Sequence, residues 1–154
     1  MKIIVCVDDN YGFSFNNRRQ SQDRNLISFL CEKFKESTIK IKSYSSRLFS
    51  DYLPIDEFDK NSSINSNIKL INNVFEYRFY DINSNDYLFV EQFPDFIDYK
   101  KYIDEIVYCH WNKKYPADVF CPKPEEISND FRLVSEEIIC GSSHDKINIK
   151  IYKK

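Results

Sequence analysis

A polar segment near the N-terminus carries the side chains best suited to ligand binding or proton chemistry: Arg18, Arg19, Gln20 and Asp23. A guanidinium can hold a carboxylate or phosphate through two parallel hydrogen bonds, and a carboxyl in a cleft can act as an acid or base. Adjacent arginines on a polar loop are more often solvated, however, and Asp23 could simply stabilise a helix dipole. The segment therefore predicts either an anion-binding cleft or an ordinary polar loop.

The cysteines and histidines favour no metal site. Cys109 and His110 are the one adjacent pair of soft ligands, but two residues do not make a zinc site, and neighbours in a strand point to opposite faces. A hydrolase or nuclease using His110 has little support, because the chain lacks a serine or cysteine nucleophile motif. His144 falls in the segment 141–145, which predicts a hairpin turn. The five cysteines form no Cys-x-x-Cys pair, so we expect free thiols in a cytoplasmic protein.

Length and composition predict one domain spanning residues 1–154, with a core drawn from the 42% of hydrophobic residues. The net charge of -2 comes from interspersed acids and bases, so neither nucleic acid nor an anionic membrane is an expected partner. No apolar run reaches membrane length. The chain has 2 glycines, where average usage gives roughly ten, which argues against glycine-dependent phosphate loops.

The segment 87–111 is the organising unit of the chain. Apolar runs at 87–90 and 106–111 predict two strands, and the spacing of apolar residues after Pro94 predicts a short amphipathic helix between them. Strands joined by such a crossover are parallel and linked in a right-handed sense. Ligands bind beyond the carboxyl ends of parallel strands, so a cofactor phosphate would be expected at the turn 90–93.

Other patterns extend this α/β interpretation. The run 2–7 predicts a central strand, and the segment 13–22 predicts a loop. Apolar residues from Leu26 to Phe34 predict the buried face of a helix. This helix would begin at Ser21 or Asp23, with Ser21 as its cap and Asp23 in its first turn. Alternation in the C-terminal region predicts an antiparallel pair. The remaining expectations are strands at 39–43, 68–71, 74–80, 131–140 and 146–152, a partly helical crossover at 47–64 and a loop at 112–130.

Several local strings resemble the dihydrofolate reductase family. The run 5–10, with Gly12 and 15–18, resembles that family's first strand and mobile active-site loop, and 117–122 is similar to its Gly/Ala-Asp-x-x-Phe-Pro string. The segment 87–111 can be laid on the family's cofactor strand, helix and next strand without a gap, and 147–153 resembles its closing strand. The likeness covers most of the chain and is weak between 45 and 85. It implies a dihydrofolate reductase-like fold, with a central, mostly parallel sheet, an antiparallel C-terminal strand pair and flanking helices.

The resemblance also assigns site residues. Asp23 matches the family's buried acid that binds the pterin, Cys109 falls where the family has a threonine near that acid, and Phe96 falls on the tyrosine beside the nicotinamide. Asp23 and Cys109 are the catalytic candidates if the protein is an enzyme. With Phe96 added to the polar segment, the ligand-binding candidates are Arg18, Arg19, Gln20, Asp23 and Phe96.

The departures from the family concern the cofactor. Glu91 and Gln92 replace the paired glycines of the family's cofactor turn, and 43–46 replaces its phosphate-binding Gly-Arg-x-Thr, with Arg47 displaced. Arg19 and Gln20 replace the Pro-Trp of its active-site loop. A carboxylate at Glu91 repels an anion, at a cost of about a few kcal/mol where the contact is desolvated. We therefore expect a lost cofactor turn and no cofactor.

These observations leave two functions open. The leading hypothesis is a divergent family member without NADPH-dependent reductase activity, acting as a binding or protein-interaction module. Its old cleft would take an anionic small molecule or nucleotide through Arg18, Arg19 and Asp23, and its partner is an unidentified protein or small molecule. The alternative is an NADPH-dependent reductase of a folate-like or pyrimidine-like substrate, with Asp23 as acid and a rebuilt cofactor site.

Overall fold

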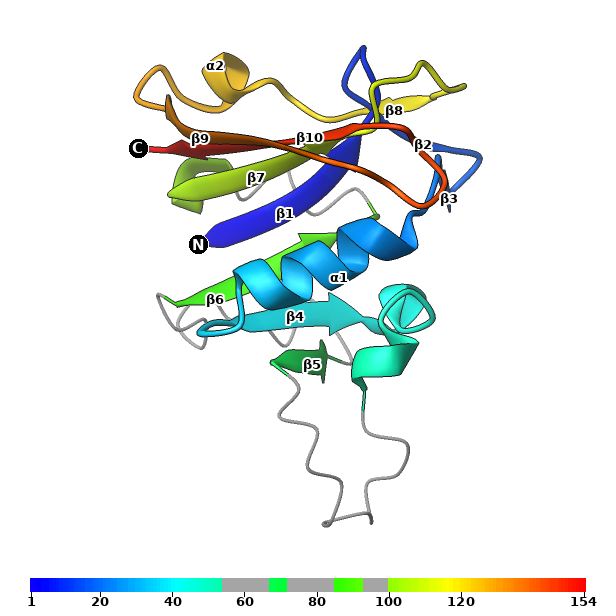
Figure 1. The fold of residues 1–154 in the computed structure, drawn as a ribbon. Helices are drawn as coiled ribbons and strands as arrows, with labels where there is room; N and C mark the ends of the chain where they lie inside the picture. The colour runs from blue at the N-terminus through cyan, green and yellow to red at the C-terminus, as the bar shows by residue number, and fades with distance from the viewer. Residues whose placement is uncertain (54–66, 72–84, 93–99) are drawn as a thin grey trace.

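The fold is built on a mixed sheet of seven strands in the order β5-β4-β6-β1-β7-β10-β9 (Figure 1). The computed structural model describes residues 1–53, 67–71, 85–92 and 100–154. β1 is parallel to β6 and β7, β4 is parallel to β5 and β6, and β10 is antiparallel to both β7 and β9. A mostly parallel sheet with an antiparallel C-terminal pair was expected from the sequence, and both are present. The strands are β1 (Lys2–Val7), β4 (Thr38–Lys42), β5 (Ile68–Ile71), β6 (Asp86–Val90), β7 (Glu105–His110), β9 (Arg132–Ile139) and β10 (Ile147–Lys153).

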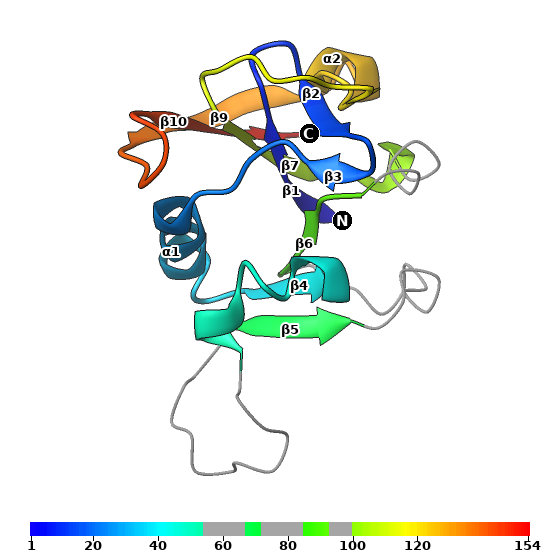
Figure 2. The same cartoon turned by 90° about the vertical axis from the view of Figure 1, so that its right-hand side faces the viewer.

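Helix α1 (Arg24–Lys33) covers one face of this sheet (Figures 1 and 2). Its buried residues Leu26, Ile27, Leu30 and Cys31 follow helical spacing, so they form one stripe against the sheet. They join a core cluster that includes the inward-facing isoleucines of β4 and β10. The expected apolar face of the helix is confirmed.

The start of α1 differs from the expectation. Asp23 is the N-cap, with extended backbone angles of φ -148° and ψ 125°, and its side chain accepts hydrogen bonds from the N–H groups of Asn25 and Leu26. The predicted cap at Ser21 and the placement of Asp23 in the first turn are therefore wrong. A carboxylate in extended conformation reaches the free N–H groups of the first turn better than a residue two positions earlier.

A second core fills the opposite face of the main sheet, and a small sheet packs against it. β2 (Gly12–Phe15) pairs with both β3 (Arg18–Arg19) and β8 (Val119–Phe120). The expected loop 13–22 is thus partly a hairpin, because Asn16 and Asn17 take positive φ angles of 50° and 58°, as a tight two-residue turn requires. The expected loop 112–130 is mostly irregular but includes β8 and the short helix α2 (Pro124–Ile127).

Short 3-10 turns occupy other connections, at η1 (Ser43–Ser45), η2 (Ser50–Tyr52) and η4 (Lys100–Tyr102). The expected strand 74–80, most of the helix after Pro94, and Phe96 lie outside the described residues. Within the described ranges, no helix is long and apolar enough to cross a membrane.

Candidate functional site

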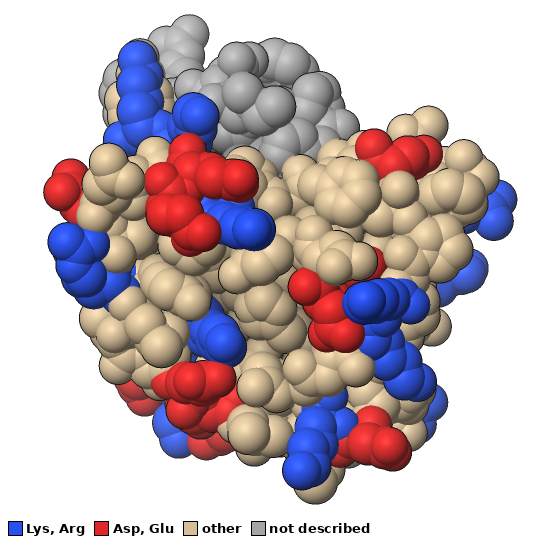
Figure 3. Space-filling model, turned by 90° about the horizontal axis from the view of Figure 1, so that it is seen from above, with Lys and Arg blue, Asp and Glu red and all other residues tan. Residues whose placement is uncertain are grey.

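Several loops gather at the carboxyl edge of the parallel strands, where α/β sheets bind ligands. Glu91 follows β6, η1 follows β4, and Trp111 follows β7. The β2–β3 hairpin and the segment leading to Asp23 cross the same edge. On a different side of the molecule, the side on which α2 and the β9 edge of the sheet lie, acidic and basic side chains are interspersed (Figure 3).

Arg19 and Glu91 form a bidentate ion pair at this edge. Arg19 Nε lies 2.8 Å from Glu91 Oε1, and an Nη2 hydrogen bond of 2.9 Å reaches Oε2. Ser45 Oγ donates to Oε2 at 2.6 Å. The side chain of Glu91 is 8% exposed and that of Arg19 is 21% exposed. The carboxylate is therefore neutralised by the protein's own guanidinium and largely shielded from solvent.

Tyr44 holds Arg19 in place. The Arg19 backbone N–H donates to Tyr44 Oη at 3.0 Å, and Arg19 Nη2 donates to the Tyr44 carbonyl oxygen at 3.0 Å. The guanidinium also lies over the Tyr44 ring, 4.5 Å from its centroid. We call Arg19, Tyr44, Ser45 and Glu91 the arginine clamp. It ties β3 to the segments that follow β4 and β6.

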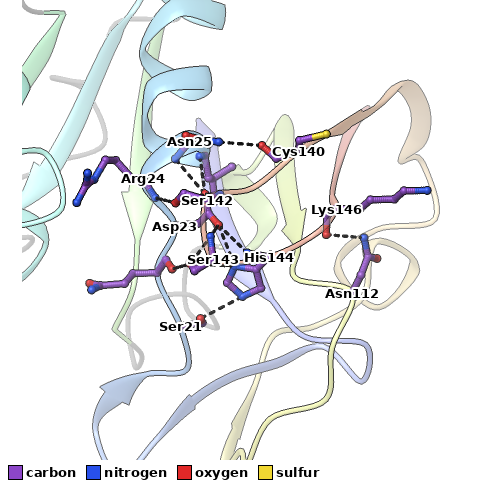
Figure 4. Close-up of polar contacts among 12 residues, drawn as sticks. Ser21, Asp23, Arg24, Asn25, Asn112, Cys140, Ser142, Ser143, His144 and Lys146 are labelled. Atoms are coloured by element: carbon purple, nitrogen blue, oxygen red, sulfur yellow. Dashed lines mark hydrogen bonds and ion pairs between the residues drawn. The ribbon is translucent and has the colours of Figure 1, made fainter.

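Asp23 is the centre of a second polar group (Figure 4). It is 3% exposed. Besides capping α1, its carboxylate accepts backbone N–H bonds from the β9–β10 turn, from Ser142 at 2.9 Å, Ser143 at 2.8 Å and His144 at 3.2 Å. The hydroxyls of the two serines add bonds of 3.2 Å. A buried carboxylate with this many donors has little capacity left for a ligand.

The surroundings of Asp23 keep it ionised. Burial alone would raise its pKa, but the N–H groups of Ser142 and Ser143, the side chain of His144 and the N–H of Leu26 together hold the pKa of Asp23 well below its usual value. Asp23 therefore has no proton to donate near neutral pH.

His144 completes this group. Its Nδ1 lies 3.0 Å from Asp23 Oδ2, and its ring stacks on Trp111 with centroids 4.6 Å apart. Its Nε2 lies 3.1 Å from Ser21 Oγ and 2.9 Å from Tyr115 Oη. The predicted hairpin turn at 141–145 is confirmed, since it joins the antiparallel strands β9 and β10, but the burial of His144, which is 4% exposed, was not predicted. We call Ser21, Asp23, Tyr115 and His144 the histidine cluster.

Gly141 gives the turn its close approach to Asp23. A Cβ atom at this position would lie 2.5 Å from Asp23 Oδ2 and 2.5 Å from the carbonyl oxygen of His144. Only a residue without a side chain fits there. In a chain with 2 glycines, a glycine beside His144 was the sequence signal that could have pointed to this contact.

Arg18 and Gln20 line an open cavity of about 450 Å³ together with Tyr115. Gln20 Nε2 donates to Asp8 Oδ2 at 3.1 Å. Its Oε1 is buried and has no hydrogen-bond partner among the described residues. The described residues also offer Arg18 no ion-pair partner, so this cavity presents one unpaired cation.

The remaining candidates are separated from these groups. Cys109 is fully buried in the core cluster under α1. His110 packs on the opposite face against Tyr11 and Tyr108, which confirms that Cys109 and His110 point apart. Burial lowers the pKa of His110 to about 4. Gln92 is exposed, and the described ranges contain no group of 3 or more His, Cys, Asp or Glu residues placed to hold a metal ion.

Comparison with known proteins gives a match in structure but none in sequence. No family model matches this chain, and no curated protein matches it in sequence. Among solved structures, it is similar to a dihydrofolate reductase from Enterococcus faecalis complexed with NADP(H) and RAB-propyl. The two share 12% identity, with a TM-score of 0.63 over 99% of this chain and 94% of that chain. The chain therefore has a dihydrofolate reductase-like α/β fold.

Proposed function

We propose that this protein lacks NADPH-dependent reductase activity and acts as a binding module for a small anionic ligand. The observation that carries this proposal is the arginine clamp. The resemblance in sequence places cofactor phosphates at Glu91–Gln92 and at 43–46, and the clamp joins these same two segments through Arg19.

NADPH does not fit the clamp as it stands. An incoming phosphate would meet the Glu91 carboxylate or would have to draw Arg19 away from it. The first change places two like charges together, and the second leaves the Glu91 carboxylate, whose side chain is 8% exposed, without its partner. Such a loss costs about 3–5 kcal/mol for fully buried pairs. The same segments bind phosphate in α/β proteins when they present free N–H groups and glycines.

The contacts and the low pKa of Asp23 also fit poorly with the role of a proton-donating acid in a reductase. A group that assists protonation of a substrate must carry a proton or relay one from water, and its pKa should lie near the working pH. The pKa of Asp23 is held far below that range, and its oxygens accept bonds from Leu26, Ser142 and Ser143. These contacts favour a structural carboxylate over a substrate-binding one.

The cavity beside Arg18 supports anion binding. A guanidinium on its rim suits a carboxylate or phosphate. The proposed ligand is thus a small anion, such as a nucleotide or an amino-acid-like acid. Arg19, which Glu91 holds in place, forms part of the cavity wall.

Isothermal titration calorimetry tests this proposal with adenosine monophosphate, glutamate and dihydrofolate as probes. We expect at least one of them to bind, and Arg18→Gln to weaken its binding about tenfold or more, the effect of losing one charged hydrogen bond. Arg132→Gln, on exposed β9, is the matched control and should leave binding unchanged.

Two results would contradict the proposal. Failure of every probe to bind would remove the anion-binding module. Dihydrofolate-dependent oxidation of NADPH by the purified protein, abolished in Asp23→Asn, would establish the reductase alternative instead.

A further inference from the structure

In the histidine cluster, a carboxylate, an imidazole and a serine hydroxyl are hydrogen-bonded in the order that activates a serine nucleophile. We propose that Ser21, His144 and Asp23 act together as nucleophile, base and orienting carboxylate in the hydrolysis of small carboxylic esters. The three residues come from the segment before α1 and from the β9–β10 turn, far apart in sequence. Their hydrogen bonds run in one line from Asp23 through His144 to Ser21 (Figure 4).

Asp23 fixes the tautomer of His144. A carboxylate only accepts hydrogen bonds, so the contact of 3.0 Å between Asp23 Oδ2 and His144 Nδ1 places a proton on Nδ1. Nε2 of the neutral ring is then an acceptor directed at hydroxyl groups. Stacking on Trp111 prevents the ring from turning away. The imidazole is thus held as a base before any substrate arrives.

Ser21 is the hydroxyl that this base can activate. Its Oγ lies 3.1 Å from His144 Nε2, within the reach that proton transfer requires. Ser21 is half-buried, while His144 beneath it is buried. Ser21 also borders a void of about 10 Å³ with Gln20 and Arg19, two residues that line the larger Arg18 cavity. The nucleophile is therefore the member of the unit that faces outward.

Tyr115 supplies a second hydroxyl at the same place. Its Oη lies 2.9 Å from His144 Nε2 and 3.4 Å from Ser21 Oγ. Nε2 accepts one hydrogen bond, so when Ser21 donates to it the hydroxyl of Tyr115 donates to Ser21 Oγ instead. That hydroxyl can then donate to the oxygen that becomes negative as the carbonyl is attacked.

The reaction balances with water as the only co-reactant. Ser21 Oγ bonds to the ester carbonyl carbon and its proton passes to His144 Nε2. The carbon–oxygen bond to the alcohol then breaks, and the leaving oxygen takes the proton from Nε2. Water, deprotonated by the same nitrogen, attacks the acyl-serine, and the acid leaves as Ser21 recovers its proton.

The neighbouring cavity suggests the kind of ester. An acyl group that carries a carboxylate could place it near Arg18; this preference rests on the proposed function. The nucleophile itself does not depend on that preference. A neutral probe therefore tests Ser21, and an anionic ester tests the cavity separately.

The test uses a neutral alkyl fluorophosphonate, which transfers its phosphonyl group to activated serines with loss of fluoride. Intact-protein mass spectrometry should show one adduct per chain, and peptide mapping should place it on Ser21. Ser21→Ala should abolish the adduct, whereas Ser128→Ala, a half-buried serine at the C-terminal end of α2, should not. Absence of an adduct on the folded protein, or an equal adduct in Ser21→Ala, would overturn the proposal.

Variants of the base and of Tyr115 test the roles. His144→Gln, checked for folding by circular dichroism, should slow labelling about a hundredfold or more, as expected for loss of a general base. A His144→Gln protein that folds and labels at the wild-type rate would overturn the proposal. Tyr115→Phe should slow hydrolysis of para-nitrophenyl acetate about tenfold or more, and an unchanged rate would remove Tyr115 as the oxyanion donor.

Arg18→Gln separates the two proposals. The wild type should hydrolyse the para-nitrophenyl monoester of succinic acid faster than the neutral acetate, and Arg18→Gln should lose this preference while Ser21 is still labelled. Equal rates for the two esters in a wild type that is labelled on Ser21 would overturn the preference for an anionic acyl group and leave the nucleophile in place.

Discussion

The arginine clamp and the histidine cluster both place a shielded carboxylate at the same edge of the sheet, but they differ in what the partner can do next. Glu91 is paired with a guanidinium, which only donates hydrogen bonds and stays charged. Asp23 is paired with an imidazole, whose second nitrogen still faces two hydroxyls. A carboxylate paired with arginine leaves no group that can accept a proton, whereas a carboxylate paired with histidine leaves a ring nitrogen that can act as a base.

The two groups also differ in how they are built. The clamp lies at the strand ends: Arg19 is in β3, Glu91 follows β6, and Ser45 ends the η1 turn that follows β4. Its ion pair joins residues that are 72 positions apart. The histidine cluster spans 121 positions between Asp23 and His144. It depends on the β9–β10 turn folding back onto the start of α1. Breaking the cluster should therefore disturb the fold more than breaking the clamp.

The largest expected effect is that of Asp23→Ala. This change removes the cap of α1 and leaves the N–H groups of the β9–β10 turn and the ring of His144 without their acceptor. We expect a loss of about 3–5 kcal/mol in the free energy of unfolding, measured by urea denaturation. Asp145→Ala, an exposed acid in the same turn, should change stability by less than about 0.5 kcal/mol. Equal losses for the two variants would mean that Asp23 does not hold the turn.

The next effect is that of opening the clamp. Arg19→Met leaves Glu91 shielded and unpaired, and because Arg19 is 21% exposed we expect a loss near the low end of the range for buried pairs, about 3 kcal/mol. The double variant Arg19→Met with Glu91→Gln removes both charges and should recover part of this loss. A double variant whose loss equals the sum of the single ones would show that the two residues are not coupled.

A smaller effect should follow from Gly141→Ala, which perturbs the cluster and leaves the clamp intact. The added Cβ would lie 2.5 Å from Asp23 Oδ2, so the turn must shift away from the carboxylate. Overpacking of this kind costs about 1–3 kcal/mol. Urea denaturation measures the loss, and fluorophosphonate labelling of Ser21 should slow in parallel. Wild-type stability in Gly141→Ala would show that the turn does not need this close approach.

The sequence predicted the strands and α1 well because their signals are local. Alternation in β10 and helical spacing in α1 follow directly from which face each residue buries. The sequence also marked Arg19, Asp23 and Glu91 as unusual, but it gave no means of pairing them. The Arg19–Glu91 ion pair depends on the β2–β3 hairpin. The sequence predicted a loop there, because the residues before Arg18 are polar.

His144 was missed for a related reason. Its neighbours in sequence are turn residues, and nothing within the turn indicates that the ring is buried against Trp111 and Asp23. The contact is set by the docking of the β9–β10 turn on α1, which is a tertiary event. The fold could thus be inferred from local patterns, while the histidine cluster required the three-dimensional arrangement.

Stability should respond to acid through Asp23. Because its pKa in the folded protein is depressed below the usual 3.8, its contribution to stability is fully present above the unfolded pKa and is lost as pH falls through the folded pKa. Urea denaturation between about pH 5 and pH 2 should therefore show a steeper loss for the wild type than for Asp23→Asn. Asp145→Asn should follow the wild type. Identical slopes in all three proteins would contradict the ionised state of Asp23.

The most direct test of the account is a thermal-shift titration of the purified protein with NADPH. A ligand at a hundredfold excess over its Kd adds about 2.7 kcal/mol to the stability of the folded state, which raises Tm by several degrees. Because the arginine clamp occupies both segments expected to hold the cofactor phosphates, we predict no change in Tm at millimolar NADPH. A saturable rise of several degrees would show that the clamp opens for the cofactor and would contradict the proposal that the protein lacks reductase activity.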